Sequence, residues 1–186
     1  MFSSDSAAFL PDLEGTEVTL DSPAEPSFSI PRQAWVITEK LSERAMQMRQ
    51  DDIDDNLGPP FTAAKCLCHR ANNPAKVAFM RIYAQIPIVG TEFQKPKGRA
   101  KQAAPPCTHA ELTALKALKK MRCSVVPDLL GYQEGVQDQD GPVPGGYITH
   151  VVWDKVPGEP LRPETFWSLE FPSREKIRAQ FRKVYD

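Results

Sequence analysis

An arginine interrupts an apolar run that otherwise has the composition of a buried strand. The run extends from Ala75 to Ile88 and reads AKVAFMRIYAQIPI, with Arg81 near its middle. A guanidinium is a planar fork of N–H donors, which suits two-point contact with either a phosphate or a carboxylate. The sequence therefore presents a choice between a site that handles a phosphorylated ligand and an internal ion pair.

Cysteines and histidines supply a second set of candidate ligands. In CLCH, Cys66 and Cys68 are two residues apart and share one face of a strand, whereas His69 lies on the other face. Zinc needs four converging ligands, usually from paired Cys-x-x-Cys turns, and no second such pair occurs in the sequence. We therefore expect buried, unreactive thiols and no metal site, although three more residues could complete one in principle: Cys107, His109 and Cys123.

Clusters of charge have simpler interpretations than ligand binding. The stretch Asp51–Asp55 has four carboxylates but lacks the glycine and the closing glutamate of a calcium loop, so a solvated linker is predicted. The basic segment Lys95–Lys101 is predicted to be a solvated loop, with an acidic partner as the alternative. Asp138 and Asp140 are interpreted as acids of a hairpin loop.

Composition excludes several classes of protein. The chain has 186 residues, of which 41% are hydrophobic and 25% charged, as expected for one globular domain. A net charge of −1 argues against nucleic-acid binding through a basic surface. No apolar run is long enough to span a membrane, and the N-terminus lacks the features of a secretion signal. We expect a cytoplasmic or nuclear protein whose four cysteines are reduced.

A tail and a helix are predicted for the first part of the chain. Residues 1–33 are rich in Ser, Asp, Glu and Pro, which predicts a disordered tail. A short partner-binding motif around Phe28 and Ile30 is the alternative. Residues 38–49 carry apolar side chains at helical spacing and predict a helix. The apolar positions are Leu41, Ala45 and Met48.

Four strands are predicted for the remainder of the chain. Residues 61–70 and 75–88 favour extended structure and are joined by Asn-Asn-Pro, which predicts an antiparallel hairpin. Two further strands are expected within residues 125–135 and 146–156, on either side of an acidic loop rich in Gly and Pro. His150, in the last of these, is expected to be a hydrogen-bonded strand residue.

Two more helices follow from capping residues and apolar spacing. Residues 107–121 predict a helix with Thr108 and Glu111 as a capping box and with His109 at the surface. A terminal helix capped by Ser173 is also predicted. The expected buried positions are Leu112, Leu115, Leu118, Ile177, Phe181 and Val184. The elements together predict an α+β fold: a twisted antiparallel sheet of about five strands with one packed helix, plus N-terminal and C-terminal helices.

The order of these segments and two short sequence motifs resemble a known family. Two motifs are similar to those of diverged fungal proteins described as protein-kinase-like or aminoglycoside-phosphotransferase-like: PVPGGYI, Pro142–Ile148, and WDKVPG, Trp153–Gly158. The resemblance covers about residues 60–186 and is to the small N-terminal lobe of the kinase-like fold. It implies a lobe over residues 34–160 after the 1–33 tail, and a helical segment over 161–186 that begins a large lobe.

The resemblance also implies positions for a nucleotide site that would hold ATP with Mg²⁺. The strand lysine of the family falls on Arg81, and the helix glutamate that pairs with it falls on Glu111. Lys65, on the preceding strand, could substitute for the missing lysine. The adenine-binding linker falls on Val152, Trp153, Asp154 and Lys155.

Several departures from the family weaken the nucleotide interpretation. Where a glycine-rich loop is implied, only Gly58 is present, and two prolines that lack amide hydrogens follow it. An arginine at position 81 favours a closed pair with Glu111, and Phe79 projects a ring from the same strand face. The catalytic aspartate loop and the metal-binding motif implied by the family do not occur before Asp186.

We therefore expect a non-catalytic, truncated kinase-like protein without a cofactor, which binds another protein or itself. The expected contact face contains the aromatic segment FWSLEF: Phe166, Trp167, Leu169 and Phe171. An ATP-binding phosphotransferase-related protein is the alternative. A small enzyme of unrelated chemistry also stays open, although no nucleophile–base pair is evident in the sequence.

Overall fold

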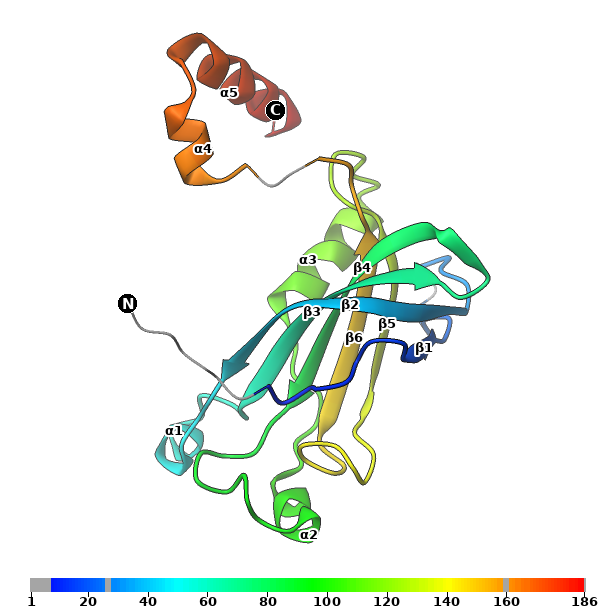
Figure 1. Cartoon of the computed structure of the whole chain (residues 1–186), viewed down its shortest axis with the longest axis vertical. Helices are drawn as coiled ribbons and strands as arrows, with labels where there is room; N and C mark the ends of the chain where they lie inside the picture. The colour runs from blue at the N-terminus through cyan, green and yellow to red at the C-terminus, as the bar shows by residue number, and fades with distance from the viewer. Residues whose placement is uncertain (1–7, 26–27, 159–160, 186) are drawn as a thin grey trace.

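The computed structural model describes residues 8–25, 28–158 and 161–185 and has an α+β fold (Figure 1). An antiparallel sheet of six strands is accompanied by short and medium helices. The strands are β1 Glu17–Leu20, β2 Gln33–Met46, β3 Phe61–Arg70, β4 Asn73–Gln85, β5 Leu129–Val136 and β6 Tyr147–Asp154. The helices are α1 Gln50–Asp54, α2 Pro96–Arg99, α3 Ala110–Lys120, α4 Pro163–Ser168 and α5 Phe171–Tyr185, with a 3₁₀ turn at Ala100–Gln102.

The sheet has the strand order β1-β2-β3-β4-β6-β5 and is nearly barrel-shaped. The predicted β3–β4 hairpin and the β5 and β6 strands are confirmed. Side-chain contacts link the two edge strands: the Asp21 backbone N–H, next to β1, donates to Gln133 Oε1 of β5 at 2.9 Å. A Cβ added at Gly131 of β5 would lie 2.8 Å from the Leu20 side chain. The strong curl of the sheet therefore brings β1 against β5.

Alternating side chains of the central strands fill the inside of the curled sheet. The inward positions of β3 and β4 include many small residues, which suit the narrow interior of a closing sheet. They are Thr62, Ala64, Cys66, Cys68, Ala78, Met80, Ile82 and Ala84. Trp35 and Ile37 of β2 and Val152 of β6 complete this core.

Helix α3 covers the outer face of the same sheet (Figure 1). Its Leu112 is buried, and Leu115 packs against the same cluster. The sheet side of this layer is mainly aromatic and contains Tyr83, Tyr132, Tyr147 and Trp153. The sheet therefore buries both faces, one against itself and one beneath α3.

The helix predicted for residues 38–49 is wrong, because residues 33–46 form strand β2. Irregularities in the pairing with β3 fall between Ile37 and Glu39 and between Lys40 and Ser42. Each inserts an extra residue, so inward side chains are spaced by three instead of two. The predicted stripe is absent from the structure, because Leu41 is 40% exposed and Met48 lies beyond the end of β2.

The prediction of a disordered tail is wrong for the described part of residues 1–33. This segment contributes β1 to the sheet and packs Leu10 and Leu20 into the core. Phe28 and Ile30, the alternative partner-binding motif, are 6% and 5% exposed and contact the cluster beneath α3. Neither is therefore available to a partner.

The terminal elements of the helices also differ in detail from prediction. Helix α3 begins at Ala110, with His109 at the N-cap and no side-chain cap bond, so the Thr108–Glu111 capping box is wrong. Helix α5 begins at Phe171, and Ser173 lies within it. Residues 51–54 of the predicted Asp51–Asp55 linker instead belong to helix α1, which begins at Gln50. On α5, Phe181 is 62% exposed, against the buried position predicted for it.

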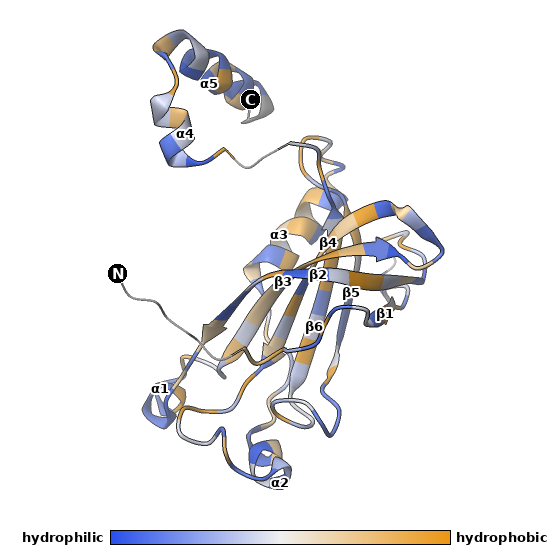
Figure 2. Ribbon diagram, in the orientation of Figure 1, coloured by the Kyte–Doolittle hydropathy of each residue, from blue (hydrophilic) through white to orange (hydrophobic). Residues whose placement is uncertain are grey.

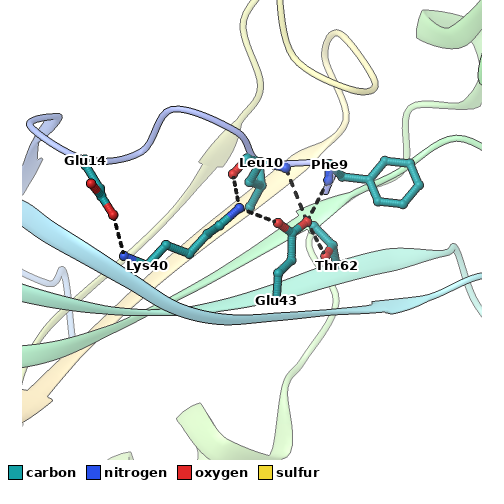
Figure 3. Close-up of polar contacts among 6 residues, drawn as sticks. All are labelled: Phe9, Leu10, Glu14, Lys40, Glu43 and Thr62. Carbon is teal, nitrogen blue, oxygen red and sulfur yellow. Dashed lines mark hydrogen bonds and ion pairs between the residues drawn. The ribbon is translucent and has the colours of Figure 1, made fainter. Parts of the chain in front are cut away.

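A polar cluster fastens the N-terminal segment across the inside of the sheet (Figure 3). The Glu43 carboxylate, which is 9% exposed, accepts hydrogen bonds from the backbone N–H groups of Phe9 and Leu10 and from the Thr62 hydroxyl. Lys40 Nζ lies 3.0 Å from Glu43 Oε2 and donates to the Leu10 carbonyl oxygen. Lys40 and Glu43 share a face, although three residues apart, because of the irregularity between Lys40 and Ser42.

We expect Glu43→Gln to lower the free energy of unfolding by about 1–2 kcal/mol, because the variant loses the charge that satisfies three donors and Lys40. Chemical denaturation would measure the loss, and hydrogen exchange should show faster opening of residues 8–16. Glu39→Gln, an exposed change on the same strand, is the matched control. Equal stability of the two variants would contradict this account of the cluster.

Candidate functional site

The outer face of the sheet gathers the basic residues singled out by the sequence. Lys65 of β3 and Arg81 of β4 are directly opposite in the β3–β4 register, so both side chains belong to one face. Phe79 lies on the same face, as predicted from its spacing to Arg81. This face is the one that α3 covers, and Glu111 stands in the first turn of that helix.

The predicted contact between Arg81 and Glu111 is confirmed. Arg81 Nε donates to Glu111 Oε2 at 3.1 Å, and Arg81 Nη2 lies 3.4 Å from Glu111 Oε1. The two side chains are 25% and 29% exposed, so the pair is largely shielded from water. The guanidinium fork is therefore occupied by one carboxylate, and this arrangement answers the question posed by an arginine in a buried strand.

Tyr83 is a member of this cluster that the sequence reasoning missed. Its hydroxyl donates to Glu111 Oε2 at 2.7 Å. Burial, together with this hydrogen bond to a carboxylate, raises the pKa of Tyr83. Its position two residues after Arg81 was the available signal, because that spacing places both side chains on one strand face.

Aromatic rings occupy the space beside the basic side chains. Lys65 Nζ lies 4.2 Å from the centroid of the Phe79 ring, and the Arg81 guanidinium lies 5.9 Å from the Trp153 ring. The Phe79 and Trp153 rings contact each other with centroids 6.1 Å apart. Lys65 has no ion pair among the described residues, so its ammonium is held by a ring face instead of a carboxylate.

The linker predicted at Val152, Trp153 and Asp154 is wrong, because these residues form the end of β6. Val152 and Trp153 are paired with β4 on one side and with β5 on the other. Backbone groups of a central strand are taken up by the ladder and are not offered to a ligand. The Asp154 side chain forms an ion pair with Lys76 of β4.

His109 is buried, contrary to the surface position predicted for it. Its ring stacks on Tyr83 with centroids 3.7 Å apart and an interplanar angle of 9°. Burial lowers the pKa of His109, so the ring is neutral at pH 7. The imidazole therefore helps to seat the start of α3 on the sheet, and no spacing rule in the sequence indicated this role.

Cys66 and Cys68 are buried, as the sequence predicts. Burial raises the pKa of the Cys66 thiol to about 11 and that of Cys68 to about 12, so neither forms a nucleophilic thiolate at pH 7. Cys107 and Cys123 are partly exposed free thiols. Within the described ranges, no three residues of the metal-binding types are grouped to hold an ion.

Comparisons with known proteins bring no further assignment: no family model, no curated protein and no solved structure matches this chain. Among the helices described, none is long and apolar enough to cross a membrane. The geometry alone therefore bears on what the site can do.

The arrangement around Arg81 is suited to fastening a helix and poorly suited to cradling phosphate. The guanidinium is closed on Glu111, two rings lie beside it, and Gly58 is followed by the prolines at 59 and 60. Lys65 lies on this face with no ion pair in the described structure, so its charge is available to an anion. Of the residues predicted to bind nucleotide, the fold brings together Lys65, Arg81 and Glu111. Val152–Asp154 instead form part of strand β6.

We expect a coupling free energy of about 1 kcal/mol between Arg81 and Glu111, because the pair is shielded and makes two contacts. The measurement is a double-mutant cycle with Arg81→Met and Glu111→Gln, read by chemical denaturation. The same cycle at Arg32 and Asp21, whose side chains are 71% and 64% exposed, should give a value near zero. If the coupling free energy at Arg81 and Glu111 is no larger than at Arg32 and Asp21, the pair does not hold α3 to the sheet.

His150 is the second histidine, after His109, whose environment differs from the prediction, and it lies on the inward face of β6. No hydrogen-bond partner is found for its ring in the described part of the chain, against the bonded position predicted for it. Burial lowers the pKa of His150 to about 4. Since an unfolded histidine binds a proton near pH 6.5 and the folded one does not, stability is lost as the pH falls from about 6.5 towards 4.

We expect His150→Gln to remove about 2 kcal/mol of this acid destabilisation, because glutamine does not titrate and the ring retains partial access to water. The measurement is the free energy of unfolding of both proteins at pH 7, 6 and 5. The carboxylates of Asp138 and Asp140 line the same cavity and are exposed, and burial is the cause of the lowered pKa of His150. Parallel pH profiles for the two proteins would refute the assignment.

Proposed function

We propose that this chain is a kinase-like small-lobe domain that works as a non-catalytic protein-interaction module. The observation that carries the proposal is an exposed aromatic groove on α4 and α5. Trp167 and Phe181, which both line this groove, are each 62% exposed. Large aromatic side chains that remain in water at an apolar groove are typical anchors of protein contacts.

The groove has the size and lining of a site for an apolar anchor. Its volume is about 440 Å³, and most of its lining is apolar. The lining residues are Leu161, Pro163, Phe166, Trp167, Ile177, Arg178, Phe181 and Arg182. Figure 2 shows apolar and polar residues alternating along α5, at a distance from the sheet. The two helices therefore present a mixed face whose apolar part lies open.

Arginine side chains rim the groove and define the charge of its partner. Arg174 lies 5.3 Å from the Trp167 ring and Arg178 lies 5.4 Å from the Phe166 ring. Between Leu161 and Tyr185 there are six Lys or Arg residues and three Glu. The partner that fits is a protein segment with an apolar anchor between acidic side chains, on this or another chain.

The remainder of the fold supports the kinase-like part of the proposal. A strand hairpin is followed by α3 and then by two strands, and the ion pair of Arg81 and Glu111 joins the strand before the helix to the helix itself. These are the features that the resemblance implies. The added strand β1 and the closing of the sheet are departures from it.

A nucleotide-binding role is the second candidate, and one observation favours it. Lys65 keeps an ammonium without an ion pair in the described structure, on the same face as Arg81. Opposing it are the closed Arg81–Glu111 contact and the burial of the expected linker in β6. We therefore place protein binding first.

Site-specific photocrosslinking tests the protein-binding proposal. With a photoreactive phenylalanine at position 167, we expect discrete covalent adducts with an acidic protein or with a second copy of the chain, lost when Arg178 and Arg182 are changed to Gln. The control position is Phe93, which is 101% exposed but lies outside the groove. The same adducts from positions 167 and 93 would contradict the groove as an interface. Sedimentation velocity separates self-association from a different partner.

A thermal-shift assay with ATP and Mg²⁺ separates the two functions. We expect a change in Tm of less than about 1 °C at millimolar nucleotide. The Arg81 guanidinium is already bound to Glu111, and the two prolines after Gly58 have no amide hydrogen to donate to a phosphate. Lys65→Ala and Arg81→Ala should then behave like wild type towards nucleotide. A nucleotide-dependent rise in Tm that both variants abolish would favour the second candidate.

A further inference from the structure

A cavity lies at the mouth of the curled sheet, between the N-terminal segment and the β5–β6 hairpin. It has a volume of about 510 Å³, within the range of small-molecule sites in proteins. Most of its surface is apolar and comes from Leu10, Leu13, Ala84, Val136, Pro142 and Ile148. The cavity is remote from the α4–α5 groove in sequence and shares no residue with it.

The mouth is held open by contacts on both sides. On one side, Glu43 fixes the backbone of Phe9 and Leu10. On the other, Gln137 donates to the carbonyl oxygens of Gln85 and Tyr147 and accepts from the Val143 backbone N–H, which sets the β5–β6 loop. The walls are therefore preformed and do not depend on a ligand to order them.

The imidazole of His150 lines this cavity without a hydrogen-bond partner in the described structure. Its lowered pKa leaves it neutral at pH 7, with one nitrogen that donates and one that accepts. The ring is half-buried, and its nitrogens are not among the fully buried polar atoms of the described structure. They are therefore open to a hydrogen bond with a polar group of a ligand in the cavity.

The charges of the lining select the kind of head group. Asp138 and Asp140 line the cavity, and no lysine or arginine is among its described lining residues. The Asp140 backbone N–H donates to Asp138 Oδ1 at 3.2 Å, so the two acids belong to one ordered turn. Carboxylates beside a neutral imidazole favour a cation and disfavour an anion.

We propose that this cavity binds a hydrophobic amine, with its apolar body against Leu13 and Ile148 and its ammonium group directed to His150 and to the turn of Asp138 and Asp140. The ammonium donates to the imidazole nitrogen and to the carboxylates. Neither the aromatic groove nor the Arg81 cluster takes part.

Displacement of N-phenyl-1-naphthylamine fluorescence from the full chain tests the proposal. We expect decylamine to displace the probe with one site per chain, decanol to bind more weakly, and decanoate not to compete. His150→Leu should weaken decylamine and decanol alike, by about fivefold, because the imidazole serves either head group. Asp138→Asn with Asp140→Asn should weaken decylamine about fivefold and leave decanol unchanged, because only the charge is removed.

The control carries the same change of charge elsewhere: Asp51→Asn with Asp55→Asn in and after α1, both exposed. It should bind decylamine like wild type. Amide shifts on decylamine binding should map to residues 9–13 and 136–150. The proposal is overturned if decanoate binds as tightly as decylamine, if the Asp138/Asp140 variant matches the control, or if the shifts map to α4 and α5.

Discussion

The contact between the Arg81 guanidinium and the Glu111 carboxylate joins α3 to β4, and the arrangement of the outer layer follows from it. A partly buried carboxylate needs donors, and Glu111 obtains them from Arg81 and Tyr83 on the same strand face. The contact fixes the first turn of α3. Next to Glu111, Leu112 packs into the aromatic layer, and His109 stacks on Tyr83. One charged residue in an apolar strand thus orients a whole helix.

The N-terminal segment makes the sheet a nearly closed structure. Glu43 holds its beginning from the inside, β1 pairs with β2 in its middle, and Glu25 at its end accepts hydrogen bonds from Lys116 of α3 and Tyr132 of β5. The segment therefore touches the inner core, the edge and the outer helix in turn. Such a path stabilises the curl of the sheet, since opening any one contact exposes apolar surface of the next.

The two proposed binding surfaces are separate from the charges that hold the fold together. Arg81, Glu43 and Glu25 are committed to internal partners, whereas Trp167 is exposed beside Arg174, and His150 lines a cavity without a hydrogen-bond partner in the described structure. Polar groups with partners specify the fold. Polar groups beside apolar surface but without such partners are the places where an outside molecule gains most by binding.

The sequence by itself determined the regular part of this protein: the β3–β4 hairpin, helix α3, the unreactive cysteines and the Arg81–Glu111 pair. The hairpin and the helix follow from strict alternation and from the helical spacing of apolar residues, which act over short stretches of chain. The Arg81–Glu111 pair was indicated by the resemblance to the kinase-like lobe, which aligns these two positions. Tertiary structure decided β2, the packing of residues 8–25 and 28–33, and the environments of His109 and His150. In β2 the irregular pairing changes the period of the inward side chains, and that irregularity exists only against β3. The N-terminal segment has little apolar surface of its own and becomes ordered because it contacts the inner core, the sheet edge and helix α3. These contacts join residues far apart in the sequence, so no local sequence pattern predicts them.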